Sequence, residues 1–265
     1  MYSNTRATQL LINHYNKGTN MVSNEVLKYN SHKVRHSIGV LELGRNLLAK
    51  IEENSNINNE TISRAEIIFI LHDIGRFYQN NIDAILSEDH FDHGDYGFEL
   101  LKNENYDNQI LLGIKYHNKI NINGLLEDEL FNQMNDHEKQ ETLFLTKLIR
   151  DADKLQNMIY SIFNFNEYFN LGDKKFPYGD IGEKIIEKIK IGEIILYSDT
   201  NTFGERLILY YCRKFNLNFQ ESMNMLDYYN FDEKYYNFIK NTNGISDKSL
   251  KEIKKYVYNY KNIKN

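Results

Sequence analysis

The chain has 265 residues, which is enough for one large domain or two small ones. Its net charge of −5 at pH 7 gives no basic field of the kind that holds long nucleic acid, so we do not expect such a partner. One cysteine excludes a disulfide framework, and no apolar run approaches the ~20 residues of a membrane helix, so we expect a cytoplasmic protein without a membrane partner.

Apolar residues recur at helical spacing through the first part of the chain, beginning with predicted helices over 8–15 and 31–53. Ser63, with Glu66 three residues later, is interpreted as a capping box that opens the apolar segment AEIIFILHDI. After a polar loop, Asp92 and Asp107 are interpreted as N-caps of two further helices.

The second part of the chain continues in the same pattern. A long amphipathic helix is predicted over 136–163, and an aromatic-rich loop follows it at 163–179. Shorter helices are then predicted over 182–191, 201–215, 219–228 and 246–260. Strand-like alternation is limited to an ambiguous stretch at 193–197, so the predicted fold class is all-α.

Ionisable side chains lie on the apolar faces of four of these predicted helices: His36, His72, His117 and Asp153. Such groups are costly to bury unless they are paired or bind a metal. A shared metal centre explains all four at once. Imidazole together with carboxylate favours Fe, Mn, Zn, Co or Ni over Mg.

The order of the motifs resembles a known family. His36, then ILHDIGR with His72 and Asp73, then RDADKLQNM with Asp153 resemble the H…HD…D signature of the HD-domain metal-dependent phosphohydrolases. The resemblance covers about 31–164. It implies an HD-type helical bundle, with residues 1–165 as the phosphohydrolase core and 166–265 as a C-terminal helical extension. Whether the extension belongs to the same domain is left open.

The resemblance also implies a ligand set. One divalent metal would be held by His36, His72, Asp73 and Asp153, with Asp151 as the competing choice for the last ligand. HFDHGDYGFELL and GIKYHNK add two histidines, His93 and His117. These fit the H…HD…H…H…D subset, whose members hold two metals bridged by the residue equivalent to Asp73. We therefore expect one or two transition-metal ions.

The implied activity is hydrolysis of a phosphate ester or anhydride in a small nucleotide-like substrate by a metal-activated water. Asp73 would orient or deprotonate that water, and Arg76 and Lys154 would bind phosphate oxygens. Asn157 would contact the nucleotide, whereas a surface salt bridge is the competing interpretation for Arg76. Phosphomonoesterase, phosphodiesterase and pyrophosphohydrolase activities are not distinguished, and a homo-oligomer is left open.

Other interpretations of the same residues stay open. The first is a metal-binding HD fold that acts as a nucleotide-sensing or regulatory module without turnover. The second is oxygen-dependent cleavage, as in some diiron relatives of this family. The third is a purely structural helical protein, which leaves the inward-facing histidines without an explanation.

Overall fold

The computed structural model of the chain describes residues 3–20, 22–82, 91–170 and 176–258. Within these ranges the secondary structure is helical and includes no β-strand, so the predicted all-α class is confirmed. None of the helices in these ranges has the length and apolar character needed to cross a membrane. The chain divides into two compact units, Met1–Gln156 and Asn157–Asn265.

Unit 1 is built from eight helices and the larger part of a ninth among the described residues. They are α1 (Asn4–Gly18), α2 (Asn24–Glu52), α3 (Asn59–Leu71), α4 (Arg76–Ile82), α5 (His93–Leu101), α6 (Asn108–Tyr116), α7 (Asn123–Glu127), α8 (Glu129–Asn132) and α9 (Asp136–Phe163). The polar loop predicted between Gly75 and Asp92 is wrong over Arg76–Ile82, which form α4, and residues 83–90 lie outside the described residues.

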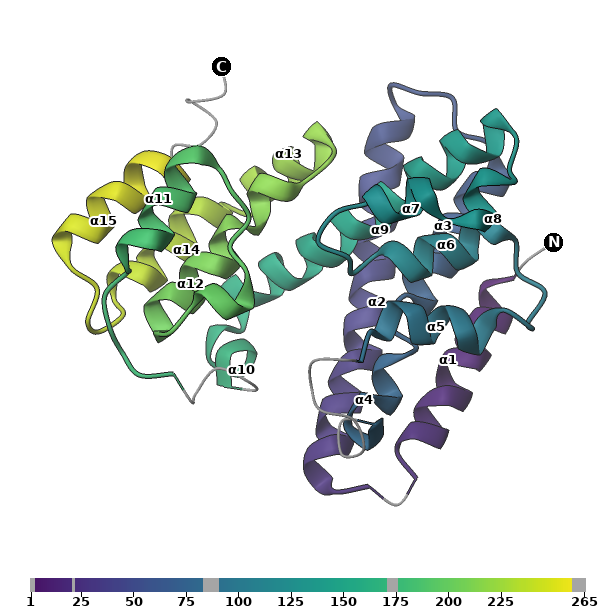
Figure 1. The fold of residues 1–265 in the computed structure, drawn as a ribbon, viewed down its shortest axis with the longest axis horizontal. Helices are drawn as coiled ribbons and strands as arrows, with labels where there is room; N and C mark the ends of the chain where they lie inside the picture. The colour runs from purple at the N-terminus through teal and green to yellow at the C-terminus, as the bar shows by residue number, and fades with distance from the viewer. Residues whose placement is uncertain (1–2, 21, 83–90, 171–175, 259–265) are drawn as a thin grey trace. The chain divides into compact units, whose positions relative to one another are not determined.

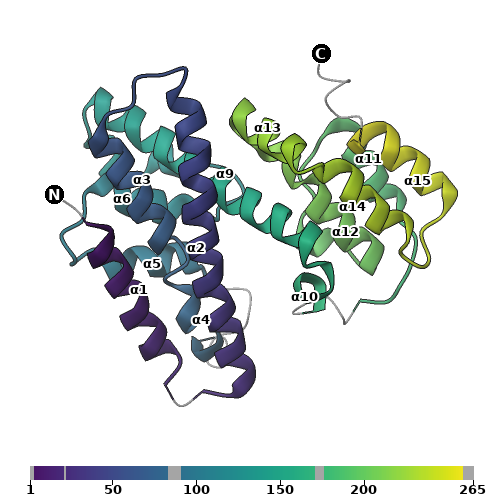
Figure 2. The ribbon, with the colours of Figure 1, turned by 180° about the vertical axis from the view of Figure 1, so that it is seen from behind.

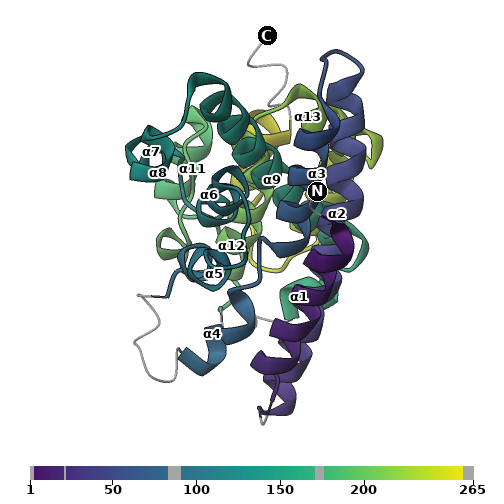
Figure 3. The same ribbon diagram turned by 90° about the vertical axis from the view of Figure 1, so that its right-hand side faces the viewer.

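The helix α3 lies at the centre of unit 1. It packs against α1, α2 and α6, and α2 runs along it as the longest helix (Figures 1 and 2). Residues 67–71 of α3 are buried on every side of the helix. The helices α5 and α6 pack side by side, as Figure 3 shows. The last turn of α3, which is fully buried, therefore leads directly to the His72–Asp73 pair.

The helix termini correct one prediction and refine another. The helix α3 begins at Asn59 with Asn58 as its N-cap, because the Asn58 side chain accepts a hydrogen bond from the Thr61 amide at 2.9 Å. The predicted capping box at Ser63 is therefore wrong, since that residue already lies in the second turn of the helix. Asp92 is confirmed as the N-cap of α5, where its carboxylate accepts from two backbone amides.

The start of α6 shows a different use of a capping residue. Asp107 occupies the N-cap position but makes no side-chain cap hydrogen bond. Its carboxylate accepts instead from Arg64 Nε at 2.9 Å. This ion pair ties the beginning of α6 to α3.

Unit 2 is also helical. Its elements are α10 (Phe165–Asn170), α11 (Glu183–Ile191), η2 (Tyr197–Asp199), α12 (Phe203–Tyr211), η3 (Cys212–Asn216), α13 (Gln220–Tyr228), α14 (Phe231–Lys240), α15 (Asp247–Ile253) and η4 (Lys254–Tyr258), together with the end of α9. Tyr211 and Tyr235 stack in its core with ring centroids 5.0 Å apart. The segment predicted as an aromatic-rich loop contains α10, and α14 was not predicted from the sequence.

Candidate metal centre

Five elements of unit 1 bring candidate ligands to one place. His36 lies in the middle of α2, and His72 and Asp73 follow directly after α3. His93 is the first residue of α5, and His117 is the C-cap of α6. Asp153 lies within α9.

The first cluster of side chains joins α2, the end of α3 and α9. His36 Nε2 lies 3.3 Å from His72 Nε2 and 3.0 Å from Asp153 Oδ1. Asp73 Oδ2 lies 3.7 Å from the Nε2 atom of each of these two histidines. Two imidazole nitrogens and an oxygen of Asp73 therefore lie close together, and Asp153 meets this group through His36.

The second cluster joins the end of α3 to α5 and α6. His93 Nε2 lies 3.2 Å from His117 Nε2. The other oxygen of Asp73, Oδ1, lies 3.3 Å from the first of these nitrogens and 3.5 Å from the second. The carboxylate of Asp73 thus stands between two histidine pairs and offers one oxygen to each.

Hydrogen bonds on the far side of the rings orient the histidines of the first cluster. His36 Nδ1 lies 2.5 Å from Gln156 Oε1, and His72 Nδ1 lies 3.0 Å from the carbonyl oxygen of Phe69. A carbonyl oxygen can only accept, so Phe69 requires a proton on His72 Nδ1, and the amide oxygen of Gln156 does the same for His36. The electron pair of each Nε2 atom then points into the cluster, as a metal ligand requires.

The second cluster has the same kind of support. His117 Nδ1 lies 2.6 Å from the carbonyl oxygen of Ile114 and donates to it. His93 Nδ1 lies 3.3 Å from the side-chain amide of Asn118. These outer contacts fix how both rings turn toward Asp73.

Two of the histidines, His72 and His93, are kept neutral by their surroundings. Burial lowers the pKa of His72 to about 4, against an ordinary value of 6.5. Burial, together with the nearby positive charge of Arg76, holds the pKa of His93 well below its ordinary value. Neutral imidazole is the form that binds a metal, so neither ring must lose a proton at pH 7.

The two carboxylates are kept ionised. Burial alone would raise the pKa of Asp73, but the positive charge of Lys33 and the adjacent His72 outweigh burial and hold that pKa well below its usual range. Burial also opposes ionisation of Asp153, and its contact with His36 at 3.0 Å outweighs burial, so the pKa of Asp153 is lowered. Each cluster therefore combines at least one neutral imidazole, His72 or His93, with the negative charge of Asp73.

This donor set fits divalent transition metals. His36, His72 and Asp73 form one buried group of potential ligand atoms, and Asp73, His93 and His117 form another, with the atoms of each group within 4.8 Å of one another. Mixed imidazole and carboxylate ligands suit Fe, Mn, Zn, Co or Ni, whereas Mg is usually bound by oxygen atoms alone. The cofactor expected from the sequence thus has a suitable set of side chains.

A glycine makes the close approach of the second cluster feasible. A Cβ atom at Gly75 would overlap the carbonyl oxygen of His93 and would lie 3.1 Å from the amide nitrogen of Gly97. The turn after α3 can therefore contact the start of α5 only because residue 75 has no side chain. This contact brings His93 within reach of Asp73.

The remaining residues predicted for the site have different surroundings. Arg76 Nε lies 3.5 Å from Asp73 Oδ1, beside the second cluster. Lys154 Nζ donates to the carbonyl oxygen of Arg150, one turn back along α9, at 3.2 Å. Asn157 accepts a hydrogen bond from the hydroxyl of Tyr168 at 3.4 Å. The predicted roles of Lys154 and Asn157 in substrate binding stay predictions.

Lys33 is a residue of the site that the sequence analysis did not identify. Its Nζ atom lies 3.0 Å from Asp73 Oδ2, and its side chain is 15% exposed. The signal was its position, because Lys33 lies three residues before His36 and so shares a face of α2 with it. Lys33 and Arg76 place one cation beside each oxygen of the central carboxylate.

Comparison with known proteins agrees with this geometry. The family model described as "HD domain" matches residues 34–158, a range that contains all six candidate metal ligands. Searches of curated proteins and of solved structures found no match. HD domains bind divalent metals, and their family consists mostly of hydrolases. Residues 34–158 of this chain therefore match the HD domain family, and the His and Asp side chains clustered within that range are compatible with a metal site of this family.

Proposed function

We propose that the protein is a dinuclear metal-dependent phosphohydrolase that acts on a small phosphorylated substrate, with a nucleotide as the best candidate. One observation carries the proposal: the two oxygens of Asp73 face two separate histidine pairs. The first metal would be held by His36, His72, Asp73 and Asp153. The second would be held by His93 and His117 together with the other oxygen of Asp73.

The chemistry follows from the groups around that carboxylate. When bound, divalent metals lower the pKa of a coordinated water toward ~7 and withdraw charge from phosphoryl oxygens. Asp73 is kept ionised, so it can accept a hydrogen bond from a water in the site. Phosphate hydrolysis needs no nucleophilic side chain in this arrangement, and the site requires none.

Cations of the chain support a phosphorylated substrate. Lys33 and Arg76 lie on the two oxygens of Asp73, where their positive charges can bind the non-bridging oxygens of a phosphoryl group. Lys154 and Asn157 are proposed as further contacts with the substrate. The net charge of −5 favours a small substrate over a long nucleic acid, because the chain has no overall basic field.

The test measures phosphate release. The protein would be purified without chelator, supplied with Mn²⁺, Co²⁺ or Ni²⁺, and assayed against nucleoside phosphates, dinucleoside polyphosphates, cyclic dinucleotides and alarmones. We expect turnover of at least one class, and a loss of at least 1,000-fold in Asp73→Asn. Glu99→Gln is the matched control, because this exposed carboxylate on α5 pairs only with Lys102 among the described contacts.

The same assay separates the enzyme from a sensing module. Binding of metal and nucleotide without turnover under any of the metals would contradict the proposed hydrolase and support a regulatory HD fold. Hydrolysis that persists at the full rate in Asp73→Asn would contradict the assigned centre. Oxygen consumption by an iron-loaded sample would instead support oxygen-dependent cleavage.

A further inference from the structure

Arg150 makes an unusual set of contacts in unit 1. It is 4% exposed, and its guanidinium donates to a run of backbone carbonyl oxygens just after α6. Nη1 lies 3.1 Å from the oxygen of Tyr116, 3.2 Å from that of His117 and 2.5 Å from that of Lys119. Nη2 lies 3.1 Å from the oxygen of Ile120.

These carbonyl oxygens need hydrogen-bond donors from outside the helix. The last carbonyl groups of a helix have no acceptor role within the helix, and a cation near them interacts favourably with the helix dipole. Only a guanidinium presents several donors in a rigid planar fork, which can serve four oxygens that lie in different directions. Arg150 therefore fixes the path of residues 116–120 where the chain leaves α6.

The segment held in this way supports both histidines of the second cluster. It contains His117 itself. Asn118 contacts His93 Nδ1 at 3.3 Å and donates to Asp92 at 3.0 Å. Lys119 also pairs with Asp92, the N-cap of the helix that begins with His93, at 2.7 Å. Arg150 thus contacts the backbone of His117 directly and supports His93 through Asn118 and Lys119.

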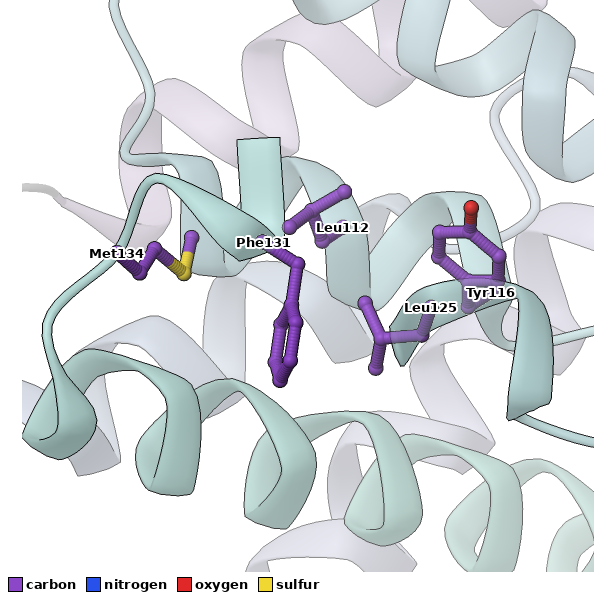
Figure 4. Close-up of a cluster of buried hydrophobic side chains, with 5 residues drawn as sticks. All are labelled: Leu112, Tyr116, Leu125, Phe131 and Met134. Carbon is purple, nitrogen blue, oxygen red and sulfur yellow. The ribbon is translucent and has the colours of Figure 1, made fainter. Parts of the chain in front are cut away.

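The rest of α6 is held independently of Arg150. Figure 4 shows a cluster of buried side chains around the end of this helix, made up of Leu112, Tyr116, Leu125, Phe131 and Met134. The hydroxyl of Tyr116 also donates to Asp128 at 2.9 Å. Loss of the guanidinium would therefore release residues 117–120 while the helix stays packed.

The first cluster uses other supports. His36 is oriented by Gln156 and His72 by the carbonyl of Phe69, and neither contact involves residues 116–120. We propose that Arg150 is the positioning residue of the second metal site, and that its removal selectively weakens binding of the second metal. This inference rests on the proposed dinuclear centre and assigns its second position a support outside the ligands.

The experiment titrates metal-free protein with Co²⁺ and follows binding by calorimetry and by the absorption of the bound ion. In wild type we expect two binding steps. In Arg150→Met the affinity of the first step should stay within about threefold of wild type. The affinity of the second step should fall by about 10–100-fold, the usual effect of losing a residue that supports a metal ligand. Arg150→Lys should show the same selective loss, because an ammonium has three donors on a single atom and cannot span the four carbonyls.

Arg64→Met is the matched control. Arg64 is also a largely buried arginine of unit 1, and it holds the opposite end of α6 through Asp107 and also pairs with Glu141. Its loss should lower thermal stability without changing the second binding step. A selective loss of the second metal in this control as well would overturn the specific role of Arg150.

The outcomes separate this inference from the proposed function. Wild type that takes up no Co²⁺ would contradict the metal centre itself. Two steps in wild type and unchanged steps in Arg150→Met would overturn only the role of Arg150, as would an equal weakening of both. If circular dichroism shows that Arg150→Met does not fold, Arg150→Lys, which keeps the charge and the aliphatic stem, decides between these results.

Discussion

The imidazoles of His36 and His72 approach each other through their Nε2 atoms, which lie 3.3 Å apart. Both Nδ1 atoms meet oxygens on the far side of the rings, so the two electron pairs face each other in a buried site. Such an arrangement becomes favourable when a metal ion lies between the nitrogens and accepts both electron pairs. This pair therefore indicates a metal site more directly than the number of histidines in the chain.

Acid should destabilise the metal-free protein through its buried histidines. The pKa of His72 is about 4 in the folded chain and near 6.5 in the unfolded chain. Between these values the unfolded state binds more protons, so the free energy of unfolding should fall as pH drops from 6.5 to 4, by roughly 3 kcal/mol for this residue. His93 acts in the same direction.

Urea unfolding in EDTA across this pH range measures the effect. His72→Leu should show a shallower dependence on pH in the same window, because it has lost one of the titrating groups. A free energy of unfolding that is constant from pH 6.5 to 4.5 in wild type would contradict the buried neutral imidazoles.

Gln156 should control binding of the first metal through His36. Gln156→Leu removes the oxygen that accepts from His36 Nδ1, so the ring is free to turn and its tautomer is no longer set. We expect the affinity of the first metal to fall by about 10–100-fold. Gln156→Glu keeps an acceptor at this position and should retain binding. Equal affinities in the leucine and glutamate variants, measured by competition with a chelating dye, would rule out this role.

Gly75→Ala should damage the second cluster. The added methyl group meets the backbone of His93, which cannot move aside as a flexible side chain can, so we expect a loss of about 1–3 kcal/mol in stability. Binding of the second metal should weaken with it. Gly124→Ala is the control, because a Cβ atom there makes only an ordinary contact at 3.4 Å with the Tyr116 ring. Similar melting temperatures for the two variants would contradict the close packing at Gly75.

Lys33→Met should weaken binding of the substrate and leave binding of the metals unchanged. A hydrogen bond to a charged partner contributes about 1.5–3 kcal/mol, so KM should rise by roughly 10–100-fold, with metal content unchanged. Lys33→Arg should retain most of the affinity. Lys28→Met, at an exposed position of the same helix, is the control. Loss of bound metal with an unchanged KM would show instead that Lys33 supports the metal centre.

The sequence predicted the helical class and several helix positions because the apolar spacing is regular where helices face a core. The bounds of the helix over 136–163 and the N-cap at Asp92 are confirmed. The capping box at Ser63 failed because several residues before the apolar run can cap a helix, and the fold uses Asn58. The helix α14 was missed although its buried residues, Phe231, Tyr235 and Ile239, recur at the four-residue spacing of a helix.

The sequence also predicted only part of the candidate site. The motifs pointed to six residues whose side chains the structure places together, although their roles as ligands stay a prediction. Lys33, Gln156 and Arg150 were not found, because a lysine, an amide or an arginine on a helix usually faces solvent. Their importance comes from partners 40, 120 and about 30 positions away, which no local pattern reveals.

The most direct test of the central claim is anomalous X-ray diffraction from crystals grown with Mn²⁺ or Fe²⁺. We predict two anomalous peaks, one beside each oxygen of Asp73. His36, His72 and Asp153 should coordinate the first ion, and His93 and His117 the second. A single peak that leaves one histidine pair empty would contradict the dinuclear centre, and the absence of any peak beside Asp73 would contradict the metal site altogether.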